Sequence, residues 1–401
     1  MYKYKRNGFT LVELMAVIII ISLIALLTFP NIINQINKTK KSNNKMIEDV
    51  VIEQAKKYIH DNDSEYTEDD EYCIPLTKLI DNDYIKEDLT SINDIKDNKV
   101  IHLTRTNSDS YEVMDKDKCV ITPTAVKYLL KKTNPKTITN YTDGDIHEMY
   151  TFEHEATVQT PALTDYRYIG SDPNNYVEFN DELWRIIGVF SVEDENGKWE
   201  NKIKITRDSS INEYYVWDAN NINEWKTSSL QNYINTNYKN DLSSESKSFI
   251  SKTKYYLGGS SWESGIDYGT GIDIYNWERG NEAYGSHDIN WIGEIGLMYP
   301  SEFVYTYTLG IDDNCFQDGS KCSSNNKERG WIYNSSKKDQ WLISPNKKLE
   351  NYVFMISRNG SVDSNGVDKT WYEFRPTLYL NTKVKITFGD GTESNPYKLS
   401  M

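Results

Sequence analysis

The sequence predicts an α+β protein with a long N-terminal membrane-spanning helix, a small α+β head and a larger mixed α+β domain. Residues 9–29 carry one charge, at Glu13, and 21 residues are enough for a helix to cross a bilayer. Residues 9–143 contain no glycine, which favours a long helix followed by a compact unit. All ten tryptophans lie within residues 184–371, and this change of composition predicts a separate C-terminal domain over residues 165–401.

Charge is distributed unevenly along the chain. The total is −15, and residues 1–46 hold seven Lys or Arg against one acid, a net +6 that leaves −21 for the rest. A body this acidic repels phosphate backbones, which disfavours nucleic acid as a partner. Basic residues before the apolar segment and an acidic body after it predict a single-pass protein of the cell membrane, with a cytoplasmic N-terminus and an extracellular C-terminal body.

Apolar residues at three- and four-residue steps continue the helical pattern beyond the membrane segment. Ile47, Val51, Ala55 and Tyr58 mark one apolar stripe. We therefore expect a helix over residues 9–60 whose second half is amphipathic.

An acidic stretch follows this helix. Asp61, Asp63 and Glu65 match the start of a calcium-binding loop, but Tyr66 stands where such a loop needs glycine. The pattern favours a solvated acidic loop. We expect no cofactor and no metal site in the chain, with calcium as the alternative.

Residues 61–133 predict the small head, with one short helix and two strands, and residues 134–164 read as a linker rich in Thr and Asn. The four cysteines form two neighbouring groups. In an exported chain they predict the disulfides Cys73–Cys119 and Cys315–Cys322, and the alternative is four buried free thiols.

The C-terminal domain opens and closes with strand patterns, and residues 255–345 form a long loop region between them. Of five histidines only His287 lies in this domain, and no Ser-His-Asp order, HExxH or P-loop occurs. We therefore expect no enzyme.

Four aromatic residues of the loop region lie among acids and glycines: Trp262, Tyr268, Trp277 and Trp291. Exposed aromatic rings stack on sugar faces, and neighbouring carboxylates accept hydrogen bonds from hydroxyl groups. The pattern predicts a surface that binds a glycan or a protein. The alternative is that these rings fill the core.

The basic leader ending at Gly8, followed by "FTLVELMAVIIIISLIALLTFP", resembles the N-terminus of type IV prepilins and pseudopilins. The matching residues are Gly8, Phe9, Thr10, Leu11, Glu13 and Pro30. The resemblance implies that residues 1–8 are a leader, that a prepilin peptidase cleaves after Gly8, and that the amine of Phe9 is methylated. It also implies that Glu13 pairs with the amine of a neighbouring subunit, and that Pro30 loosens the helix during assembly.

Two weaker resemblances complete the prediction. The unit around residues 73–119 is similar to the small head of Gram-positive pilins. The two ends of residues 165–401 resemble an uncharacterised domain of Firmicute surface proteins, with a fold similar to C-type lectin-like domains. Such a bulky addition implies a minor pilin that displays an adhesion or interaction domain at the cell surface, with lipid and other pilin subunits as partners. The alternatives are an anchored surface protein with no filament role and a competence pseudopilin for DNA uptake.

Overall fold

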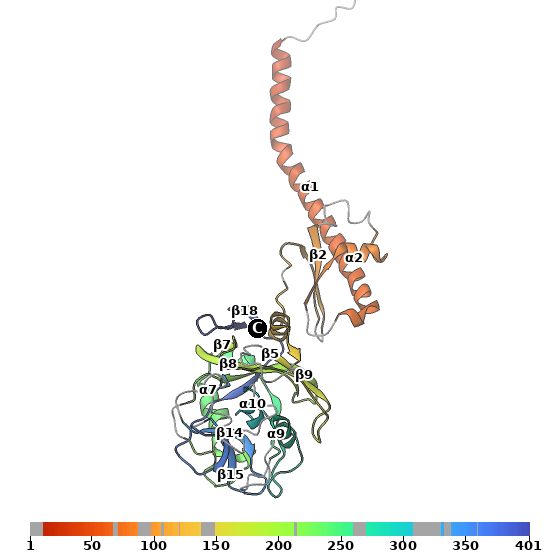
Figure 1. Cartoon of the computed structure of the whole chain (residues 1–401). Helices are drawn as coiled ribbons and strands as arrows, with labels where there is room; N and C mark the ends of the chain where they lie inside the picture. Colours follow the sequence, from red (N-terminus) through yellow and green to blue (C-terminus); the bar gives the residue numbers. More distant parts are fainter. Residues whose placement is uncertain are drawn as a thin grey trace, which may run out of the picture. The chain divides into compact units, whose positions relative to one another are not determined.

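The computed structural model describes most of the chain, in two compact units, Met1–Ile121 and Thr122–Met401 (Figure 1). The described residues are 11–66, 71–86, 98–105, 108–119, 121–137, 149–211, 215–259, 270–307, 330–332, 338–358 and 360–401, without the side chains of 23–37 and 40. Each unit has its own core.

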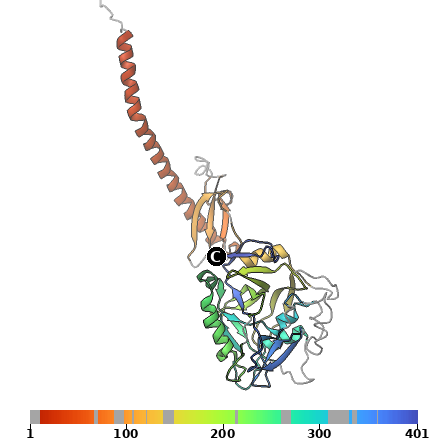
Figure 2. The same ribbon diagram turned by 90° about the vertical axis from the view of Figure 1, so that its left-hand side faces the viewer.

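The first unit is built on one long helix, α1 (Leu11–Asp61), which is followed by the short 3-10 helix η1 (Asp63–Glu65). The helix packs its C-terminal half on an antiparallel sheet of order β1-β2-β3 (Figures 1 and 2). The strands are β1 (Glu71–Pro75), β2 (Lys99–Thr104) and β3 (Ser110–Asp115), and α2 (Leu76–Asp81) follows β1. Val51, Ala55, Tyr58 and Ile59 are buried, because this spacing puts them on one face of the helix.

The described acids at the end of α1 and just after it are exposed, and they also contact other parts of the unit. Residues 67–70 of the acidic stretch lie outside the described residues. Asp61 accepts a hydrogen bond from the Tyr84 hydroxyl at 2.8 Å. The Asp63 carboxylate lies 2.8 Å from the Arg105 guanidinium, and Glu65 lies 3.1 Å from the Lys78 ammonium. These acids therefore attach the end of α1 to the strands and to α2.

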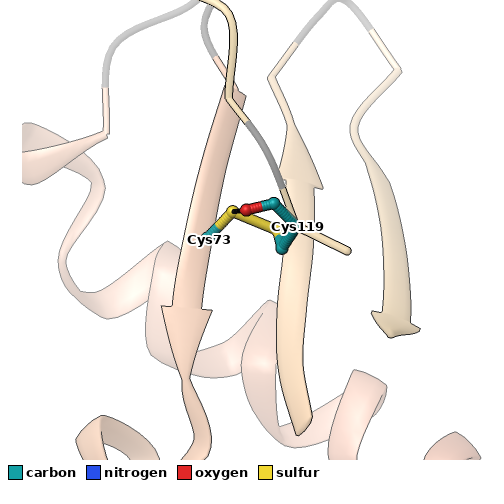
Figure 3. Close-up of a disulfide and its surroundings, with 2 residues drawn as sticks. All are labelled: Cys73 and Cys119. Atoms are coloured by element: carbon teal, nitrogen blue, oxygen red, sulfur yellow. Dashed lines mark hydrogen bonds between the residues drawn. A yellow bond between two sulfur atoms is a disulfide. The ribbon is translucent and has the colours of Figure 1, made fainter. Parts of the chain in front are cut away.

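A disulfide joins Cys73 of β1 to Cys119, which follows β3 (Figure 3). The two Cα atoms are 6.0 Å apart, and the bond closes a loop of 46 residues across the sheet. The first predicted pair is thus confirmed. Cys315 and Cys322 lie outside the described residues.

The second unit is organised around a sheet of order β10-β17-β9-β8-β6-β5-β4, with β7 beside β8 and β13 beside β17. Its strands are β4 (Lys136–Thr137), β5 (Met149–His154), β6 (Leu163–Tyr168), β7 (Tyr176–Phe179), β8 (Glu182–Glu193), β9 (Trp199–Arg207), β10 (Ile250–Ser251), β13 (Ile295–Gly296) and β17 (Thr377–Leu380). The hairpin β8–β9 is buried on both faces. The apolar run is almost continuous in β8, whereas β9 alternates lysines with isoleucines and buries both.

Short helices and small sheets cover this central sheet. The helices are α5 (Ala125–Thr133), η2 (Trp225–Thr227), α6 (Ser229–Tyr233), η3 (Ile234–Tyr238), α7 (Lys239–Asp241), α8 (Ser244–Phe249), α9 (Gly271–Glu278) and α10 (Pro300–Val304). The small sheets pair β11 (Thr253–Tyr256) with β12 (Asn290–Gly293), β15 (Tyr352–Ile356) with β14 (Gln340–Pro345) and β16 (Val362–Gly366), and β18 (Lys385–Phe388) with β19 (Lys398–Ser400).

The boundary between the units lies at residues 121 and 122, earlier than the expected end of the head at 133. Helix α5 buries Ala125 and Leu129 in the core of the second unit. The expected linker, residues 134–164, contains β4, β5 and the start of β6. Periodicity identifies an apolar helix face, but it does not say which core that face joins.

We expect loss of the disulfide to destabilise the first unit. Replacing both Cys73 and Cys119 by serine should lower its free energy of unfolding by about 2–4 kcal/mol, because the unfolded chain regains the freedom of the closed loop. Urea unfolding of the detergent-solubilised chain, followed by hydrogen exchange in β2 and β3, measures this. Amide hydrogen exchange in β8 and β9, which belong to the second unit, is the internal control. An equal loss of protection from exchange in these strands would show that the disulfide does not act on the first unit alone.

Candidate functional site

The N-terminal half of α1 presents apolar side chains that the chain itself leaves exposed. Leu11 is 76% exposed and Ile21 is 60% exposed, and the large apolar residues between them are exposed as well. Soluble monomers rarely leave so large a continuous apolar surface uncovered, so this face needs lipid or other protein chains. Glu13 lies close to the start of the described part of α1.

The other processing and assembly residues are only partly described. Gly8 and Phe9 lie outside the described residues. The backbone of α1 continues as helix through Pro30, whose side chain is not described. A search of the described side chains for a helical stretch apolar enough and long enough to span a bilayer finds none. The expected span, residues 9–29, extends beyond that set at both ends.

The second unit buries a cluster of ionisable side chains from five different elements. The Lys204 ammonium of β9 lies 2.5 Å from the Glu302 carboxylate of α10, and both side chains are fully buried. The carboxylate of Glu278, at the end of α9, accepts hydrogen bonds from the Ser301 amide at 2.8 Å and from the Ser301 hydroxyl at 2.6 Å. These contacts connect the central sheet to two of the helices that cover it.

The cluster continues through arginines that stack on aromatic rings. Arg167 lies 2.7 Å from Asp165 and 4.4 Å from the ring centre of Tyr305. Arg279 lies 3.5 Å from the ring centre of Tyr275. A guanidinium placed over a ring is stabilised by cation–π attraction, which is strongest where water is excluded.

Burial and pairing set the protonation of this cluster. Burial raises the pKa of Glu278 to about 7, against the opposing effects of Arg279 and Ser301. Burial lowers the pKa of Lys204 to about 8, although Glu302 opposes the shift. At Asp165 burial acts to raise the pKa, but Arg167 and His154 outweigh it and hold the value at about 2.

The cluster has no room for a substrate beside Glu278. The cavity there, lined by Ile274, Trp277 and Phe354 among others, has a volume of about 10 Å³. This volume is enough for about one water molecule. The arrangement therefore cross-links the core instead of forming an open catalytic site. Within the described part of the chain, no three His, Cys, Asp or Glu side chains are placed to hold a metal ion.

Two of the four predicted ligand-binding aromatics are described, and neither is fully exposed. Trp277 on α9 and Trp291 on β12 are half-buried and pack against the core, Trp291 with its ring centre 5.3 Å from that of Tyr255. Trp262 and Tyr268 lie outside the described residues. Trp371, which the sequence analysis did not select, is 52% exposed and stacks on Tyr372. No period or motif marks it, because it stands alone in a turn.

A hollow of about 420 Å³ opens on the surface of the second unit, partly within the predicted loop region. Its lining comes from the turn after α9 and from the connection between β14 and β15: Asn281, Glu282, Ala283, Gly285, His287, Ile289, Lys347 and Lys348. No sequence pattern marks this site, because its two segments are more than 50 residues apart in the chain.

Comparison with protein families identifies the N-terminal segment. Residues 3–29 match the family model of the prokaryotic N-terminal methylation motif. This prepilin-type motif implies processing by a prepilin peptidase, a membrane anchor before assembly, and a place at the surface or in a pilus afterwards. It indicates a pilin-like or pseudopilin-like structural protein.

The prepilin-type motif is the part of the chain that these comparisons identify. No curated protein matches the chain. No solved structure matches it either, so the expected similarity of the C-terminal domain to C-type lectin-like folds stays a prediction.

We expect Glu278 to make the stability of the second unit depend on pH. Its pKa is about 7 in the folded state and 4.5 in the unfolded chain. Between these values the native carboxyl holds a proton that the unfolded one lacks, so stability falls as pH rises from 4.5 to 7. Glu278→Gln keeps one acceptor oxygen for the Ser301 amide and offers its NH2 group to the Ser301 hydroxyl oxygen. It should make the unit more stable at pH 7.5 by about 1–3 kcal/mol, with little gain at pH 4.5.

The measurement is the free energy of urea unfolding at both pH values, for the natural chain and for the variant. Glu350→Gln, at an exposed carboxylate, is the matched control and should change neither value. If the free energies of unfolding of Glu278→Gln and the natural chain differ by the same amount at both pH values, Glu278 is not the source of the pH dependence.

Proposed function

We propose that this chain is a minor type IV pilin-like subunit that is cleaved after Gly8, methylated on Phe9 and assembled through α1. The methylation motif at residues 3–29 carries this proposal. In the proposal the second unit, residues 122–401, is an adhesion or interaction domain displayed outside the cell.

The exposed apolar face of α1 supports assembly through this helix. Lipid covers such a face before assembly, and the helices of neighbouring subunits cover it in a filament. Glu13 costs roughly 2.5–3.5 kcal/mol at the centre of a lipid bilayer and less near its edge. Pairing with the methylated amine of a neighbouring Phe9 removes this cost and selects one register of the helices.

Pro30 supports the same role. Its ring leaves the carbonyl of residue 26 without the backbone N–H that a helix normally supplies. The helix is therefore weakest just past the predicted membrane segment, and bending there lets α1 fit the curved packing of a filament.

The second unit supports a minor position. It is larger than the first unit, and repeating it at every position would crowd a dense shaft. A low-copy place, at the tip or between major subunits, avoids this crowding. The Cys73–Cys119 disulfide agrees with a location outside the cytoplasm.

Two other functions compete with this proposal. An anchored surface protein with no filament role would keep α1 in the membrane. A competence pseudopilin would bring DNA to the cell, but the net charge of −21 beyond residue 46 opposes contact with a phosphate backbone.

The mature N-terminus tests the processing step. We expect mass spectrometry of the chain isolated from its own cells to find methylated Phe9 as the first residue. An N-terminal peptide that still begins at Met1, in cells with active prepilin peptidase, would exclude assembly as a pilin.

Glu13 tests assembly. Glu13→Ala should leave the chain in the membrane fraction and reduce its amount in sheared filaments at least tenfold, because the pairing that fixes register is lost. The control is Glu53→Ala, on the exposed face of the C-terminal half of α1, where Glu53 pairs with Lys56. This variant should enter filaments normally. Normal incorporation of Glu13→Ala would refute this role of the carboxylate.

A further inference from the structure

The hollow of about 420 Å³ in the second unit lies within the usual size range of small-ligand sites. Close backbone contacts from Gly259 hold together the two segments that line the hollow. The Gly259 amide donates to the Glu282 carbonyl at 2.9 Å. A Cβ atom on Gly259 would lie 2.4 Å from the Pro345 carbonyl oxygen, so only glycine allows the two segments to approach this closely.

The fully buried Asn223 forms hydrogen bonds with both segments that line the hollow, the β14–β15 connection and the turn that carries His287. Its side-chain Nδ2 lies 2.8 Å from the Asn346 carbonyl, 2.9 Å from that of Leu349 and 2.8 Å from that of Tyr352. Nδ2 has two hydrogens to share among these three acceptor oxygens, and a set of acceptors alone settles the orientation of the amide. The Oδ1 atom of Asn223 therefore points to His287, 3.0 Å from Nδ1 of that ring.

This orientation fixes the tautomer of His287. Oδ1 is an acceptor only, so Nδ1 of His287 carries the proton. In the neutral ring Nε2 then offers a lone pair, and within the described part of the chain it has no hydrogen-bond partner. The ring is half-buried in the wall of the hollow. It presents a preorganised acceptor for a hydroxyl group.

Two lysines of the β14–β15 connection bring positive charge to the lining of the hollow. The Lys347 ammonium lies 2.5 Å from the Glu282 carboxylate, while exposed Lys348 makes no ion pair with any described residue. At physiological salt, charges beyond about 8 Å are largely screened. The lining of the hollow holds two lysines and one glutamate, a net charge of +1, and the neighbouring Asp288 is paired with Lys226.

We propose that this hollow binds a saccharide that carries a negatively charged group. The anionic group lies at Lys348 and Lys347, and a ring hydroxyl donates to Nε2 of His287. A neutral sugar leaves Lys348 unused, and an anion without hydroxyls leaves His287 unused. This inference rests on the proposed role of the second unit as an interaction domain.

The test uses the full chain in detergent micelles on an array of oligosaccharides that share one backbone and end in a neutral, a carboxylated or a sulfated sugar. We expect binding to the carboxylated or the sulfated member and none to the neutral one. Lys348→Ala should weaken this binding at least fivefold. Glu282→Gln should strengthen it, because Lys347 is then released from its ion pair.

Weaker binding by Lys348→Ala together with stronger binding by Glu282→Gln distinguishes a binding effect from a folding effect. Damage to the fold would weaken binding in both variants. Lys252→Ala is the matched control, a half-exposed lysine paired with Glu195 outside the hollow, and should bind as the natural chain does. Equal binding of neutral and charged sugars, no binding at all, or a loss in both variants overturns the inference. The filament tests are independent: a chain that assembles but binds no charged sugar removes this inference and leaves the proposed function standing.

Discussion

The constraint on which the rest of the molecule depends is an apolar helix face that its own chain does not cover. The first ten or so described residues of α1 expose large aliphatic side chains, while one face of the C-terminal half of the same helix is buried in the first unit. One continuous element thus belongs to two environments. Its apolar half requires lipid or neighbouring helices, and its amphipathic half supplies the core on which a three-stranded sheet can form.

The second unit meets a different physical demand, the burial of charge. Lys204, Glu278 and Glu302 are almost inaccessible to water, and each has a partner of opposite charge or a hydroxyl donor within hydrogen-bond distance. Burying a pair of ions costs several kcal/mol in lost hydration, and removing one partner costs more. Aromatic rings around the arginines reduce this cost by cation–π attraction. The cluster therefore favours one arrangement of α9, α10 and the central sheet.

Local patterns predicted the features that depend on neighbouring residues. The stripe at Val51, Ala55 and Tyr58 predicted the buried face of α1, and the leader predicted the methylation motif. The nearest-neighbour pairing of Cys73 with Cys119 was also right.

Features made by distant segments escaped prediction. Strand β17 pairs with β9 through Thr377 and Thr206, which are separated by about 170 residues. The hydrophobic pattern of each strand is visible, but its partner is not. Lys202 and Lys204 alternate with isoleucines, a pattern typical of a strand with one face in water, yet both lysines are buried. The hollow near His287 depends on the amide of Asn223, whose three carbonyl partners no sequence pattern reveals.

The disulfide of the first unit also determines how the chain carries mechanical load. A pull on the second unit acts on residue 122, and the tension reaches Cys119 three residues earlier. From there the covalent bond transfers it directly to Cys73 and on toward α1. Strands β2 and β3 lie inside the closed loop and bear none of this tension. Without the bond, the 46 residues could unravel by about 150 Å at roughly 3.3 Å per residue. The bridge thus makes the head an inextensible link under force.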